Sequence, residues 1–169
     1  MSVNLNLEKS SIKDQRISTV RKITISGIAM ALYITIMFFT QGFAFGQFQI
    51  RIATSIYALS AIYPFLIIPL GFSNLLSNTL MGGMGIFDMA GGLFVGIITS
   101  SLIYIVKKYR LNDWLIALPI IFIPGLVVPI WLSYIIHVPY MILATSVVIG
   151  QIIPGIVGVI LVKQLRGKI

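Results

Sequence analysis

Residues 114–133 read WLIALPIIFIPGLVVPIWLS, and this stretch decides the fold class. It contains no ionisable side chain over its whole length. A helix needs about 20 predominantly apolar residues to cross the hydrocarbon core of a bilayer. The stretch therefore predicts one membrane-spanning helix.

Similar uncharged runs lie on both sides of this stretch. The run between Ile52 and Ile86 is continuous, and we divide it at Pro69 and Gly71, because proline removes a backbone donor and glycine permits a turn. The sequence then predicts an all-α membrane protein with a bundle of six transmembrane helices, at 23–40, 52–68, 71–86, 89–106, 114–133 and 140–162.

The composition supports a membrane protein and excludes several other classes. The 169 residues are 58% hydrophobic and only 9% charged, whereas a soluble domain carries roughly 25% charged residues. The chain has no cysteine, one histidine and four acidic residues, too few ligands for a closed zinc site. We therefore expect no cofactor and no metal. The net charge of +8 does not indicate nucleic-acid binding, because the basic residues lie at the ends of the predicted spans.

Those basic residues also predict the orientation. They form three clusters, Lys9 to Lys22, Lys107 to Arg110 and Lys163 to Lys168. Six spans place all three clusters on one face, which the positive-inside rule assigns to the cytoplasm. We expect a cytoplasmic tail at 1–22 without a cleavable signal, a transmembrane substrate-binding domain at 23–163, and a short cytoplasmic tail at 164–169.

Arg51 and Asp88 are the two ionisable residues that stand out within the predicted outer half. A charge at the bilayer centre costs about 2.5–3.5 kcal/mol, so such residues are candidates for function. Arg51 could instead reach the lipid headgroups, although Gln47 and Gln49 precede it at strand-like spacing and could form a polar wall with it. Asp88 could instead cap the next helix, or pair with Arg51.

Further polar and aromatic residues are weaker candidates for contacting a ligand. Asn74 and Asn78 lie four apart on one helix face, and Gln151 lies inside the last span; each could equally link helices. Trp131 and Tyr134 could stack on a planar ligand or belong to an interfacial aromatic belt. His137 precedes a proline in a predicted outer loop, where a solvated histidine is the favoured interpretation.

Gly27 and Ala31 form a pair of small residues four apart in the first span. Such spacing lets another helix approach closely. The pair could pack against the protein's own helices or form a docking face for a separate membrane subunit.

The sequence contains no phosphate-binding loop, no intramembrane hydrolase signature and no evident inverted repeat. We therefore predict that the chain is not an enzyme. A free-standing small carrier is an alternative from another class, but it would need a polar path that continues to the inner face. An assembly protein is a further alternative, one that leaves Arg51 and Asp88 without a role.

The chain resembles the substrate-binding (S) components of energy-coupling-factor (ECF) transporters, most closely the QueT group of queuosine-precursor transporters. The resemblance covers Arg21 to Lys163. It departs from the family pattern at Ala53-Thr54, where a Ser-Glu pair is usual, and at Gln151, where glutamate is frequent. The residues that carry it are Arg21-Lys22-Ile23, Ala31-Leu32-Tyr33, Gly46, Gln49, Arg51, Ile68-Pro69, Gly71, Asn78, the segment Gly82-Gly83-Met84-Gly85-Ile86-Phe87-Asp88, and Gly92.

The resemblance implies a multi-pass protein of a prokaryotic cytoplasmic membrane that captures a small molecule at the outer face. The implied ligand is a queuosine precursor, either queuine or another 7-deazaguanine base; a different vitamin or heterocycle is the alternative. The implied partners are the transmembrane subunit EcfT and two cytoplasmic EcfA-type ATPases. Gly27 and Ala31 resemble the docking motif of the first helix in such proteins.

Overall fold

The computed structural model describes residues 17–46, 49–81 and 84–166. Every regular element within these ranges is helical, which confirms the predicted all-α class. The α-helices are α2 (Thr19–Ala44), α3 (Ile67–Leu80), α4 (Ile86–Lys108), α5 (Ala117–Ile136) and α6 (Tyr140–Arg166). The 3₁₀-helical segments are η1 (Ile52–Ala61), η2 (Pro64–Leu66) and η3 (Asp113–Ile116).

Four of the helical segments are long and apolar enough to cross a membrane, and they coincide with predicted spans. They are Thr19–Ala44, Ile86–Lys108, Asp113–Ile136 and Tyr140–Arg166. The two shorter apolar segments among the described residues, Ile52–Ala61 and Pro64–Leu80, overlap the remaining predicted spans at 52–68 and 71–86. The count of six spans and the orientation stay predictions.

The region 52–86 differs from its predicted form. We expected a helix at 52–68 and a break at Pro69 and Gly71, but the break lies near Pro64, and α3 already begins at Ile67. Pro69 lies in the first turn of α3, where a missing backbone N–H costs nothing because that donor has no partner within the helix. A proline in this sequence context begins a helix instead of ending one.

The η1 segment is ten residues long and almost wholly buried in the bundle. Irregular backbone at membrane depth is tolerated only where protein or a cavity covers it, and η1 lies against α2, α4 and α6. Its hydroxyl side chains lie close to backbone carbonyls. Ser60 Oγ is 2.7 Å from the Tyr57 carbonyl and 2.9 Å from the Ser100 carbonyl. Thr54 Oγ1 is 2.7 Å from the Arg51 carbonyl and shares its one proton between this group and Gln151 Oε1. The Arg51 carbonyl also accepts from the Thr54 N–H at 2.9 Å, so the hydroxyl adds a second, local bond to the same group.

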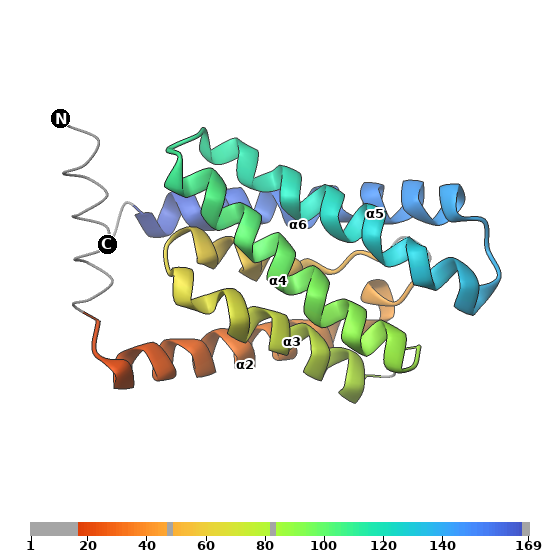
Figure 1. The fold of residues 1–169 in the computed structure, drawn as a ribbon, viewed down its shortest axis with the longest axis horizontal. Coiled ribbons are helices and arrows are strands. Elements are labelled where there is room, and N and C mark those ends of the chain that lie inside the picture. The colour runs from red at the N-terminus through yellow and green to blue at the C-terminus, as the bar shows by residue number, and fades with distance from the viewer. Residues whose placement is uncertain (1–16, 47–48, 82–83, 167–169) are drawn as a thin grey trace.

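The helices lie along the long axis of the molecule, and the first residue of α2 and the last residue of α6 lie at the same end (Figure 1). Glycines allow the closest approach between helices. A Cβ atom at Gly96 of α4 would lie 2.9 Å from the Cα of Gly71 in α3, so this contact requires glycine. The tight α3–α4 pair positions the polar side chains described next.

Candidate functional site

Arg51 lies directly before η1 and is only 4% exposed. Its Nη1 atom donates to Asn74 Oδ1 at 3.4 Å and to Asn78 Oδ1 at 3.3 Å, and its guanidinium lies over the Phe45 ring at 5.0 Å. Its Nε atom is buried without a hydrogen-bond partner in the described part of the chain. Charge-assisted N–H···O bonds are usually about 2.7–2.9 Å long, so this buried cation is only partly satisfied.

The two asparagines that face Arg51 belong to α3 and are both buried. Asn74 Nδ2 donates to the Tyr57 hydroxyl at 2.9 Å, and Asn78 Nδ2 donates to the Asp88 carbonyl at 3.0 Å. A Cβ atom at Gly92 of α4 would lie 2.8 Å from Asn78 Nδ2 and 3.0 Å from Asn74 Oδ1. Only glycine at position 92 lets both carboxamides fit against α4.

Asp88 lies in the first turn of α4, and its backbone carbonyl is the group that Asn78 contacts. The cap position is Gly85, whose φ of +95° favours glycine, so the interpretation of Asp88 as the N-cap residue was wrong. The Asp88 carboxylate accepts from the Trp131 indole N–H at 3.1 Å and from the Met84 backbone N–H at 3.3 Å. It is 3% exposed, and a carboxylate retains further lone pairs for donors.

Arg51 and Asp88 do not form an ion pair. The ion pairs among residues 17–46, 49–81 and 84–166 join Asp113 to Lys107 and to Arg166, and none joins the two buried charges. They are connected through Asn78, which accepts from Arg51 and donates to the Asp88 backbone. Each charge therefore lacks an ionic partner within this part of the protein.

Tyr33 and Tyr57 extend this network, although sequence reasoning did not select them as site residues. Their rings are stacked with centroids 5.5 Å apart, and their hydroxyls lie 3.1 Å from each other. A tyrosine in the middle of an apolar run was a usable signal, because a buried phenol normally has a hydrogen-bond partner. We refer to Tyr33, Arg51, Tyr57, Asn74, Asn78, Asp88 and Trp131 as the Arg51 cluster.

Gln49 and Gln151 meet beside the cluster. Gln151 Nε2 donates to the Gln49 carbonyl at 3.0 Å, and Gln151 Oε1 accepts from Thr54 Oγ1 at 2.8 Å. Gln151 thus joins α6 to the segment that leads into η1, which is the helix-linking role considered for it. Gln47, predicted to lie beside Gln49, falls outside the described residues.

Trp131 is the predicted aromatic residue that reaches the cluster. Its ring packs against Gly91, where a Cβ atom would lie 2.6 Å from the ring. Tyr134 is 81% exposed, and His137 is exposed at the C-terminal end of α5 with a φ of 57°. Neither has a hydrogen bond to the Arg51 cluster within the described part of the chain.

Gly27 and Ala31 lie on the exposed face of α2, whereas Ala29 between them is buried. A Cβ atom at Gly27 would meet nothing within 4 Å. Gly27 therefore does not pack against the described helices, and its face is open to lipid or to another chain.

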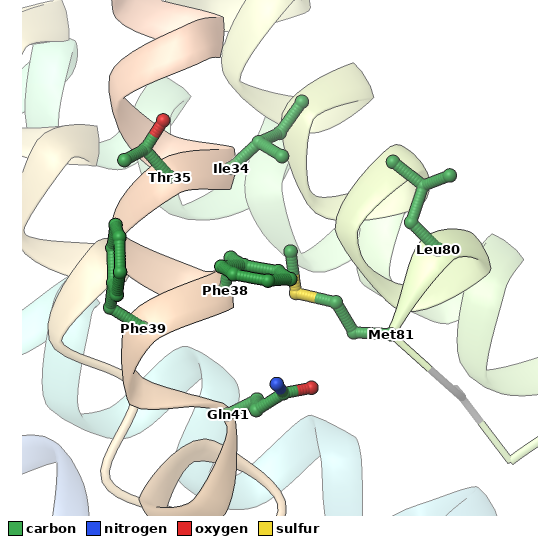
Figure 2. Close-up of a pocket in the computed structure, with 7 residues that line it drawn as sticks. All are labelled: Ile34, Thr35, Phe38, Phe39, Gln41, Leu80 and Met81. Carbon is green, nitrogen blue, oxygen red and sulfur yellow. The ribbon is translucent and has the colours of Figure 1, made fainter.

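A groove of about 530 Å³ opens between α2 and the end of α3. Figure 2 shows Phe38 of α2 and Met81, next to α3, facing each other across it. Its lining is mostly apolar, and none of the predicted ligand-binding residues contributes to it. This groove is an apolar surface, whereas the buried polar side chains lie in the Arg51 cluster.

The Arg51 cluster contains the hydrogen-bonding groups that a polar, planar solute would use. The guanidinium and carboxamides donate to ring carbonyls and nitrogens, while Asp88 accepts from adjacent N–H groups. The cluster is an arrangement for binding: the described residues include no group of three or more metal-ligating side chains, and nothing positions a nucleophile beside a base there.

An all-helical, multi-pass chain with this buried polar cluster has the character of a membrane transport protein. The chain belongs to the QueT transporter family, whose sequence profile matches residues 23–167. This match confirms the resemblance noted in the sequence. No curated protein and no solved structure matches the chain.

Proposed function

We propose that this protein is the S component of an ECF-type importer in the prokaryotic cytoplasmic membrane, and that the Arg51 cluster captures a queuosine precursor at the outer face. The ligand would be queuine or another 7-deazaguanine base. The observation that carries the proposal is the state of Arg51: buried, without an ionic partner in the described chain, and with an unused Nε donor. A ring carbonyl supplies the acceptor that this guanidinium lacks.

The rest of the cluster fits the same ligand class. A 7-deazaguanine ring presents a carbonyl next to N–H donors, and Asp88 is the carboxylate of the cluster that can accept from them. The family resemblance predicts acidic residues at positions 54 and 151, where this chain has threonine and glutamine. Gln151 is already bonded to Thr54 and to the Gln49 carbonyl. This observation favours, as a second candidate, a related heterocycle that presents fewer N–H donors for carboxylates to accept from.

The first test is to identify the small molecule that the purified protein retains, by mass spectrometry, and to titrate the ligand-free protein with it in a calorimeter. The proposal predicts a 7-deazaguanine base. Retention of a different heterocycle would support the second candidate. An absence of any retained molecule, together with no heat on titration with queuosine precursors, would overturn the assignment to a queuosine precursor.

We further propose that α2 docks onto EcfT through Gly27 and Ala31, with two EcfA-type ATPases supplying the energy. Gly27→Leu should leave ligand binding unchanged and block uptake in cells that contain the coupling subunits, because a large side chain prevents close helix approach. Gly42→Leu is the matched control, since a Cβ atom at Gly42 also meets nothing within 4 Å. Normal co-purification of the Gly27→Leu variant with EcfT would contradict the docking role.

A further inference from the structure

A hollow of about 300 Å³ lies where α4 ends and α6 ends, lined by Lys107, Arg110, Leu111 and Arg166. The end of α4 shapes it. The Leu111 N–H donates to the Val106 carbonyl at 3.1 Å, and the Arg110 N–H donates to the Lys107 carbonyl at 3.0 Å. These two bonds form a Schellman motif, a helix ending that reverses the chain through one left-handed residue.

That left-handed residue is Arg110, with a φ of 55°. Glycine is the usual residue at this position, because a side chain there is strained. Arg110 therefore has a conformational cost that glycine would avoid and that helix termination does not require. Strain of this kind points to a role for the side chain.

The charges around the hollow are unbalanced. The segments 107–110 and 163–166 carry five basic residues, and Asp113 is the neighbouring acid that pairs with them. Asp113 accepts from Lys107 and from Arg166, the latter at 3.5 Å, so its two oxygens are engaged. Arg110 makes no ion pair among the described residues. The hollow thus presents cationic donors and has room for an anion.

Apolar and aromatic side chains border the same place. Leu111 lines the hollow and is 47% exposed, and the neighbouring Tyr109 and Trp114 are exposed as well. Lys163 lies over the Trp114 ring at 4.3 Å. Exposed aromatic rings beside lysine and arginine mark the boundary between headgroups and acyl chains.

We propose that this hollow binds the phosphate of an anionic phospholipid headgroup, with Arg110 and Arg166 as its principal donors. Arginine forms paired hydrogen bonds with phosphate oxygens, and Leu111 contacts the start of the acyl chain. A free phosphate would use the same donors but gain nothing from the exposed apolar rim. The proposal does not depend on the imported ligand.

The test uses the full-length protein in detergent, with phosphatidylglycerol added and bound lipid counted by native mass spectrometry. Arg110→Gly and Arg166→Gln should each weaken retention about fivefold, from the roughly 1 kcal/mol that a basic residue contributes near an anionic surface. Arg110→Gly also relieves the left-handed strain, so this variant should melt no earlier than the unchanged protein. Lys108→Gln is the matched control, because Lys108 carries the same charge at the same helix end but does not line the hollow.

Phosphatidylcholine and inorganic phosphate complete the design. Retention of phosphatidylglycerol alone, weakened about fivefold in the two arginine variants and kept in Lys108→Gln, supports the site. Equal loss in all three variants would show diffuse attraction and overturn it. Displacement of the lipid by millimolar inorganic phosphate would show a free-anion site and overturn the assignment to lipid.

Discussion

The Arg51 cluster differs from the basic end of the molecule, formed by residues 107–110 and 163–166, in the burial and the pairing of its charges. In the cluster, Arg51 is 4% exposed and has no carboxylate partner within the described chain. At the basic end, Arg166 is 61% exposed and shares Asp113 with Lys107. A charge in water costs little with or without a partner, whereas a buried charge without one is costly. The difference means that the buried charges need a reason for the cost of their burial, whereas the exposed ones do not.

Among the substitutions considered, Arg51→Met should have the largest effect on ligand affinity. We expect ligand affinity to fall about 100-fold, because one or two charge-assisted bonds of about 1.5–3 kcal/mol are lost. Thermal stability should stay the same or rise, since the substitution removes a buried cation that has no ionic partner in the described structure. Calorimetric titration and thermal melting measure the two quantities.

Arg51→Lys is the control for Arg51→Met, because it keeps the charge but loses the planar guanidinium. It should bind ligand more weakly than the unchanged protein. A variant Arg51→Met that melts much earlier and binds normally would assign Arg51 to the fold.

Gly92→Ala should destabilise the protein by about 1–3 kcal/mol, because the added methyl group overpacks the contact between α4 and the two asparagines. Ligand affinity should fall as well, since Asn74 and Asn78 must move. Denaturant unfolding in detergent measures the first effect. Gly27→Ala, at a site with nothing within 4 Å, should change neither quantity. Equal effects of the two substitutions would contradict the packing argument.

Asp88→Ala should weaken ligand binding more than tenfold, which corresponds to about 1.4 kcal/mol, without unfolding the bundle. The carboxylate is lost as an acceptor for the ligand, while the indole N–H of Trp131 loses its partner. His137→Ala changes an exposed residue at the C-terminal end of α5, and this variant should bind the ligand normally. Unchanged affinity of the Asp88→Ala variant in a calorimetric titration would remove Asp88 from the site.

The smallest effect should come from Asp113→Asn at the basic end. Ion pairs with exposed partners contribute about 0–1 kcal/mol, and Arg166 is well exposed. We expect a small decrease in melting temperature and unchanged ligand affinity. A loss of ligand affinity in this variant would mean that the basic end and the Arg51 cluster are coupled. The two regions could then no longer be treated as independent.

The sequence predicted the long helices well and the middle of the chain poorly. The predicted spans 89–106 and 140–162 fall inside α4 and α6, because long uncharged runs have one stable form in a bilayer. The form of residues 52–66 could not be predicted in this way. Their 3₁₀ geometry depends on burial between α2, α4 and α6, which is a property of the assembled bundle.

The candidate site shows the same limit. Arg51, Asn78 and Asp88 were selected as candidates because polar groups are rare and costly in an apolar chain. The sequence could not separate Trp131, which bonds to Asp88, from Tyr134, which faces outward only three residues later. That distinction depends on how α5 is rotated about its own axis, and its two faces are similarly apolar.

The η1 segment has a mechanical consequence. A 3₁₀-helix rises about 2.0 Å per residue and an α-helix 1.5 Å, so the ten residues of η1 span about 5 Å more than they would in α form. Arg51 is attached to one end of this segment. Rewinding η1 into α form would therefore bring Arg51 and the far end of the segment about 5 Å closer together.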